Sequence, residues 1–201
     1  MKLCLILLQI LTAAGSALPL LGQHHGKAGA AEAEAQTFVV TGLRVDADSP
    51  PPGSGVGRAG ARLPGGGYLH VVHGKPYARG RVVFGGVVAF DQIWSTGAHV
   101  SSEFAVTVPV TVGGKDLEPG LYSLFTTPGR ERWTLHLNRV LGMHLADEYD
   151  ASQDVLVAAA VPTEPAEPSP DLRIEFVPAG AGVDLVIRWS AVQVSFPVRS
   201  R

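Results

Sequence analysis

Cysteine is nearly absent from this sequence, and charged residues are few. The one cysteine, Cys4, lies in the N-terminal apolar segment, so a chain cleaved after that segment contains none. Such a chain has no disulfide, no thiolate metal site and no cysteine nucleophile. Charged residues make up 17% of the sequence, below the roughly 25% of an average domain. With a net charge of -2, the chain lacks the basic excess that nucleic acid or an anionic membrane would attract, so no nucleic-acid partner is expected.

The N-terminus has the order of a secretory signal. A short basic start precedes an apolar run over 3–11, and small residues follow as far as Ala17. This order predicts a signal peptide over 1–22 and a flexible spacer over 23–36. An uncleaved anchor is the alternative, because the segment approaches the ~20 residues of a membrane span. We therefore expect an exported protein, periplasmic or extracellular, which would meet a membrane only through that uncleaved segment.

Turn residues are abundant, with 24 glycines and 15 prolines. Between them, apolar and polar residues alternate with the period of two that is typical of a half-buried strand. The expected strands cover 37–45, 68–73, 104–112, 121–127, 133–138, 154–161, 172–176 and 183–189, the last extended by 192–196. One short helix is expected near 141–147. The pattern predicts a single all-β domain over 37–201, an antiparallel β-sandwich or barrel-like fold of about eight strands.

Proline and glycine affect the expected structure in two places, a long segment before the strand at 68–73 and the strand over 104–112. Residues 46–67 have no apolar periodicity and are predicted to form a long loop. Within them, 55–60 match G-x-G-x-x-G, but no strand is expected before and no helix after, so a dinucleotide site is rejected. Pro109 lies inside the strand expected over 104–112 and has no N–H to donate. That strand is therefore expected at a sheet edge or with a bulge.

Several segments carry a resemblance to a known family. They are KPYARGRVVFGG at 75–86, IWSTGAH at 93–99, GGKDLEPGLYSL at 113–124, RWTLHLN at 132–138, RW at 188–189 and FPV at 196–198. In this order and spacing, the stretch 74–196 resembles the DUF2911 family, exported bacterial β-rich proteins of unknown function. The resemblance implies an all-β fold and no known activity. The family usually shows Arg, Asn and Glu where this chain has Ser95, His99 and Val100, so a ligand site built on that cluster would be lost or changed here.

Three histidines, His73, His99 and His136, stand where the family pattern has other residues. Neutral imidazole is the commonest metal ligand, and three can hold copper or zinc with one position open. In an exported chain without cysteine, a histidine site is the form that a transition-metal centre would take. The alternative is that each histidine is structural, because the sequence does not show that the three converge.

A basic cluster and the turn that follows it form the candidate ligand site. The guanidinium groups of this cluster would bind an anion or carboxylate through paired hydrogen bonds. The alternative is that these side chains are ordinary solvated surface charges. The turn carries Trp94, whose alternative role is core packing. The candidate site consists of Lys75, Arg79, Arg81, Trp94, Thr96 and His99.

No motif in the sequence indicates a particular reaction. The acidic stretch of Asp147, Glu148, Asp150 and Asp154 lacks the spacing of a calcium loop and is expected on a solvated surface. The sequence therefore predicts a non-catalytic ligand-binding or structural module, whose partner is a small molecule or a protein. Two alternatives stay open: a copper or zinc protein built on the three histidines, and a small-molecule enzyme with a pocket around His99.

Overall fold

A computed structural model describes residues 36–41 and 53–201, whose strands all belong to two antiparallel β-sheets. One sheet has seven strands, in the order β1 (Gln36–Thr41), β2 (Gly55–Arg62), β3 (Tyr68–Lys75), β4 (Ser102–Val106), β7 (Gly120–Thr127), β8 (Trp133–Asn138) and β9 (Asp154–Ala160). The other has five, in the order β10 (Ser169–Ala179), β11 (Gly182–Ser190), β12 (Val192–Ser200), β5 (Val110–Val112) and β6 (Lys115–Leu117).

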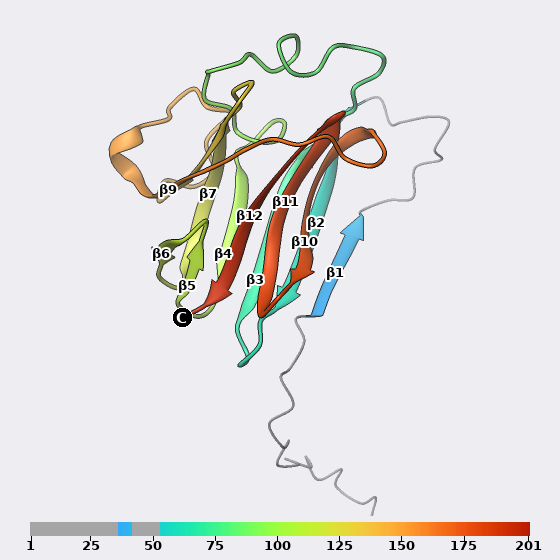
Figure 1. Cartoon of the computed structure of the whole chain (residues 1–201). Helices are drawn as coiled ribbons and strands as arrows, with labels where there is room; N and C mark the ends of the chain where they lie inside the picture. The colour runs from blue at the N-terminus through green and yellow to red at the C-terminus, as the bar shows by residue number, and fades with distance from the viewer. Residues whose placement is uncertain (1–35, 42–52) are drawn as a thin grey trace, which may run out of the picture. The chain divides into compact units, whose positions relative to one another are not determined.

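The two sheets form a sandwich rather than a closed barrel. In Figure 1 the orange and red strands β10, β11 and β12 lie in front of the cyan and green strands β2, β3 and β4. The expected all-β antiparallel sandwich is thus confirmed. The predicted signal peptide and spacer lie outside the described residues. No helix within the described residues is long and apolar enough to cross a membrane.

Alternating side chains build the core between the sheets. On β8, Trp133, Leu135 and Leu137 are buried and face inward, as their period of two predicts. Trp189 on β11 and Phe196 on β12 meet them from the other layer. Each fully buried large apolar side chain stabilises the fold by about 1.5–3 kcal/mol relative to exposure, so these strands hold the two layers together.

The chain changes sheets at Pro109. A single strand was expected over 104–112, but the structure has β4 in the seven-stranded sheet and β5 in the five-stranded sheet. The three residues between them belong to neither strand. Because Pro109 has no N–H for a ladder hydrogen bond, the strand ends before it and the chain can leave the sheet.

The loop expected over 46–67 is wrong over 55–62, where the structure has β2. This strand pairs with β1 on one side and with β3 on the other. Its inward positions include Ala59 and Ala61, which are fully buried. Glycine and alanine are depleted in strands, so the sequence pattern did not reveal it. The G-x-G-x-x-G match at 55–60 lies within this strand.

The short helix expected near 141–147 is also wrong. These residues form turns, and the helical element of the described residues is η1 (Ala151–Gln153), a single 3-10 turn. The segment 139–153 covers part of the seven-stranded sheet on its outer face. Tyr149 packs edge-on against Phe125 of β7, with ring centroids 5.1 Å apart. Phe125 faces outward, because its neighbour Leu124 belongs to the core.

Candidate functional site

A pocket of about 180 Å³ lies where β2 and β3 of one sheet face β10 of the other. Its walls combine apolar, basic and acidic side chains. The lining residues are Gly57, Arg58, His73, Lys75, Leu172, Arg173, Ile174 and Glu175. Charged and apolar residues thus line one concave surface, which is the usual setting of a binding site.

His73 lies deep in the pocket, with only 4% of its surface exposed. Its partner across the ladder is Gly57, and a Cβ there would overlap the imidazole. The ring therefore occupies space that any other residue at position 57 would fill. Its Nδ1 donates to the carbonyl of Gly74 at 3.0 Å. Burial lowers the pKa of His73 from 6.5 to about 4, so the imidazole is neutral at pH 7.

Lys75 and Asp171 form an ion pair at one side of the pocket. Lys75 Nζ is 2.5 Å from Asp171 Oδ2, and Arg173 Nε is 3.2 Å from Oδ1. Burial raises the pKa of Asp171, but hydrogen bonds and charge from Lys75 and Arg173 outweigh it, so the net shift is downward. Leu172 also donates its N–H to the carbonyl of Pro76 at 2.9 Å. These contacts tie β10 to the segment after β3.

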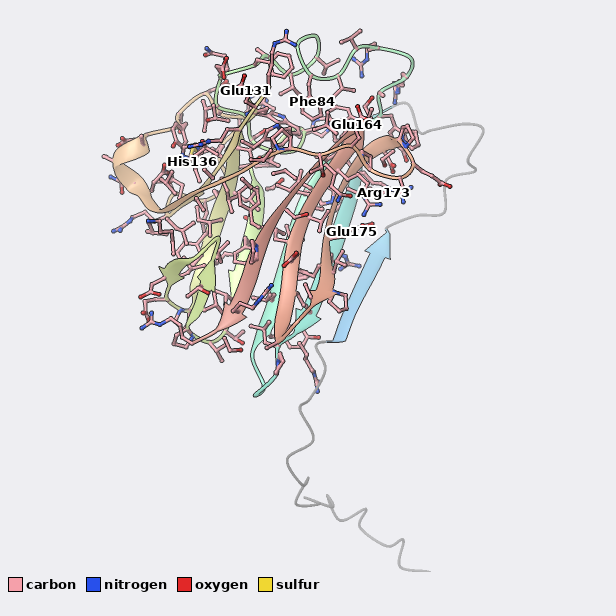
Figure 2. All side chains as sticks on the ribbon, in the orientation of Figure 1. Phe84, Glu131, His136, Glu164, Arg173 and Glu175 are labelled. Atoms are coloured by element: carbon pink, nitrogen blue, oxygen red, sulfur yellow. The ribbon has the colours of Figure 1, made fainter. Side chains whose placement is uncertain are left out.

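The basic residues of the lining outnumber the acidic ones, three to one. Asp171 is engaged by Lys75 and Arg173, and Glu175 accepts a hydrogen bond from Arg188 at 3.0 Å. Arg58 forms no ion pair with any described residue. Figure 2 shows Arg173 and Glu175 on β10 where it passes β2. The pocket therefore carries an excess of positive charge.

Of the six predicted ligand residues, only Lys75 lines this pocket. Arg79 Nη2 donates to the carbonyl of Gly53 at 3.0 Å. Arg81 donates to the carbonyls of Ala78 and Tyr77 at 3.0 and 2.8 Å. Both guanidinium groups thus hold backbone in place around the segment that follows β3.

The other three predicted ligand residues belong to the turn at 94–99. Trp94 stacks on Trp189 of the core, with ring centroids 6.0 Å apart. Thr96 is buried, and its hydroxyl is 2.9 Å from that of Thr126. His99 is exposed and has a φ of 70°. None of the three lines the pocket between β2, β3 and β10.

The three predicted metal ligands have different surroundings: His73 lines the pocket, His99 is exposed, and His136 is on β8. His136 bonds to Asp154 and Thr127. Within the described part of the chain, no group of three or more His, Cys, Asp or Glu side chains is arranged to hold a metal ion. Copper or zinc binding stays a prediction. The solvated surface expected for Asp154 is wrong, because its side chain is 6% exposed and bonded to His136.

Sequence reasoning missed Arg58, Arg173 and Asp171. The sequence pattern around Arg58 predicted a loop. The alternation over 172–176 predicted that Arg173 points away from the core, but it did not show which residues lie near it. The one available signal was that Arg173 and Glu175 alternate with apolar residues on a strand. Packing of β10 against β2 depends on contacts between residues over 100 positions apart, which a local pattern does not contain.

Comparison with known proteins identifies one family model. The model described as "Protein of unknown function (DUF2911)" matches residues 59–198. No curated protein and no solved structure matches the sequence. The matched range contains every strand from β3 to β11 and most of the pocket lining.

Proposed function

The chain belongs to the DUF2911 family, whose function is unknown, and from that premise we propose that it binds a small anionic molecule in the pocket between β2, β3 and β10. The observation that carries the proposal is the charge of the lining. Arg58, Lys75 and Arg173 are among the residues that line it, and Glu175, the one acidic residue of the lining, is paired with Arg188.

The geometry favours a carboxylate or a similar planar anion. Arg58 lies on β2 of one sheet and Arg173 on β10 of the other, and both are among the residues that line the pocket. A guanidinium presents parallel donors that match the two oxygens of a carboxylate. The neutral imidazole of His73 adds no competing charge. The volume of about 180 Å³ is below the ~300 Å³ at which drug-sized pockets begin, so the expected ligand is a short organic acid.

Binding at this pocket is proposed to be non-catalytic. With a pKa of about 4, His73 is too weak a base to remove a proton efficiently at neutral pH. Asp171 accepts from Lys75, Arg173 and Ser169, so its oxygens are occupied. The pocket is thus equipped to hold an anion rather than to transform it.

Titration calorimetry of the chain at low ionic strength tests the proposal. The probes are acetate, succinate and citrate, with acetamide as the neutral control. We expect at least one carboxylate to bind, and Arg58→Gln or Arg173→Gln to weaken it about tenfold, equivalent to ~1.4 kcal/mol. Arg132→Gln removes an exposed arginine outside the pocket and should leave binding unchanged. Binding no tighter than that of acetamide, or equal binding by all three variants, would refute the proposal.

Export to the periplasm or the extracellular space is part of the same proposal. It is supported by the basic, apolar and small-residue order over 1–22. The mass of the protein recovered from an expressing bacterium tests it. A soluble exported form that lacks the first segment supports cleavage. A full-length form in the membrane fraction supports the anchor, and a full-length form in the cytoplasm refutes export.

A further inference from the structure

A chain of three polar side chains crosses the outer face of the seven-stranded sheet. Thr127 ends β7, His136 lies on β8, and Asp154 begins β9. Thr127 Oγ1 is 3.1 Å from His136 Nε2, and His136 Nδ1 is 2.9 Å from Asp154 Oδ2. In Figure 2, His136 lies on the opposite side of the view from Arg173 and Glu175, so this cluster is separate from the anion pocket.

A single tautomer of His136 satisfies both contacts. With the proton on Nδ1, that nitrogen donates to the Asp154 carboxylate. The lone pair on Nε2 then accepts from the hydroxyl of Thr127. This is the tautomer that a histidine needs to act as a base toward a hydroxyl.

Further donors fix the position of Asp154. Asn138 Nδ2 donates to Oδ1 at 2.9 Å, and Tyr149 OH donates to Oδ2 at 2.6 Å. Burial first, and the hydrogen bond to Asp154 second, raise the pKa of Tyr149 well above its ordinary value. The phenol therefore keeps its proton and remains a donor. Two strands and the 139–153 segment thus hold the carboxylate in one orientation.

We propose that Thr127 is the nucleophile of an acyl-transfer site, with His136 as its general base and Asp154 as the residue that positions the imidazole. A hydroxyl hydrogen-bonded to a base, which is oriented in turn by a carboxylate, is the arrangement that activates serine and threonine in enzymes of unrelated folds. The substrate class is a small carboxylic ester. Val157 lies directly across the ladder from His136 and is 46% exposed, which offers an apolar surface to the acyl group.

The chemistry runs in two balanced steps. Thr127 Oγ1 bonds to the ester carbonyl carbon while its proton passes to His136 Nε2. The imidazolium then returns that proton to the departing alcohol oxygen as the ester C–O bond breaks, which leaves the acyl group on Thr127. Water attacks this acyl carbon, gives a proton to His136 and releases the carboxylic acid as Thr127 regains its proton.

The experiment uses the exported chain, p-nitrophenyl acetate and a fluorophosphonate probe. We expect ester hydrolysis above the buffer rate and one probe adduct, located on Thr127 by mass spectrometry. Thr127→Val and His136→Gln should each lose ~100-fold or more of the rate, whereas Thr127→Ser should retain it. Asp154→Asn should lower kcat with KM unchanged, because Asp154 does not touch the substrate.

Thr134→Val is the matched control, because Thr134 lies directly across the ladder from Thr127. Circular dichroism and thermal melting show which variants fold. If Thr127→Val does not fold, the adduct site and the Thr127→Ser rate decide the question. No adduct, an adduct on another residue, or equal rates for Thr127→Val and Thr134→Val would overturn the proposal. Carboxylate binding at the other pocket is measured separately, so the failure of one proposal leaves the other standing.

Discussion

Acidification tests the energetic role of His73 directly. The imidazole is buried on β3 against Gly57, and burial lowers its pKa from 6.5 to about 4. In the unfolded chain it returns to the ordinary value, so the unfolded state takes up a proton first as the pH falls. The contribution of this imidazole to the free energy of unfolding is therefore complete above about pH 6.5 and declines between pH 6.5 and about 4. Below that pH the group causes no further loss of stability.

The size of the loss follows from the shift. The pKa of His73 is lowered from 6.5 to about 4. At ~1.4 kcal/mol per pH unit, this shift reduces the free energy of unfolding at pH 4 by about 3 kcal/mol. That is a large part of the ~5–15 kcal/mol by which a domain is stable. Asp171 adds a further loss, since its pKa is also lowered, but its window begins only below its ordinary 3.8. The two contributions are thus separated along the pH axis.

Urea unfolding at pH 7, 6, 5 and 4, followed by tryptophan fluorescence, measures the effect. We expect the wild-type chain to lose about 3 kcal/mol between pH 7 and 4 beyond what His73→Gln loses, because glutamine does not titrate. His70→Gln, on the same strand but the opposite face, should keep the wild-type profile. Parallel profiles for wild type and His73→Gln would refute the reasoning that burial holds this imidazole neutral.

Three further changes have expected outcomes. Gly57→Ala places a Cβ on the imidazole of His73, and we expect about 1–3 kcal/mol of destabilisation in urea; an unchanged midpoint would show that the ring moves freely. Lys75→Met leaves Asp171 buried with Arg173 as its basic partner, so the loss should lie near the lower end of about 3–5 kcal/mol; a thermal melt unchanged at pH 7 contradicts this. Elemental analysis of dialysed protein tests the predicted copper or zinc site: one equivalent that is retained, and lost in His99→Ala, supports that site, whereas no retained metal contradicts it.

Local patterns in the sequence were sufficient for the fold class. The alternation around Leu135 on β8 is set by the pleat, which places successive side chains on opposite faces, and it needs no knowledge of the partner strand. The same logic failed on β2, where glycine and alanine leave room for large side chains from other strands. The structural role of Gly57 can be understood only once His73 is known to lie across the ladder from it.

The candidate sites depended on contacts that the sequence does not contain. Arg58 and Arg173 are brought together by the stacking of two sheets. Asp154 was interpreted as part of a solvated acidic run, because its pairing with His136 requires the register of β8 and β9. A titratable side chain acquires its role from neighbours distant in sequence, so departure from the family pattern singled out His73 and His136 but did not show what they contact.

The pairing of β5 with β12 constrains when the protein can fold during synthesis. The hairpin β5–β6 joins its sheet only through β12, which begins 80 residues after Val112 ends β5. Until the ribosome has released β12, the five-stranded sheet lacks its middle strand, and β10 and β11 are not joined to β5 and β6. Domains generally fold as units, so the complete sandwich forms only after β12 has been synthesised. The export proposed above would require passage before that point if the translocation channel accepts only unfolded polypeptide.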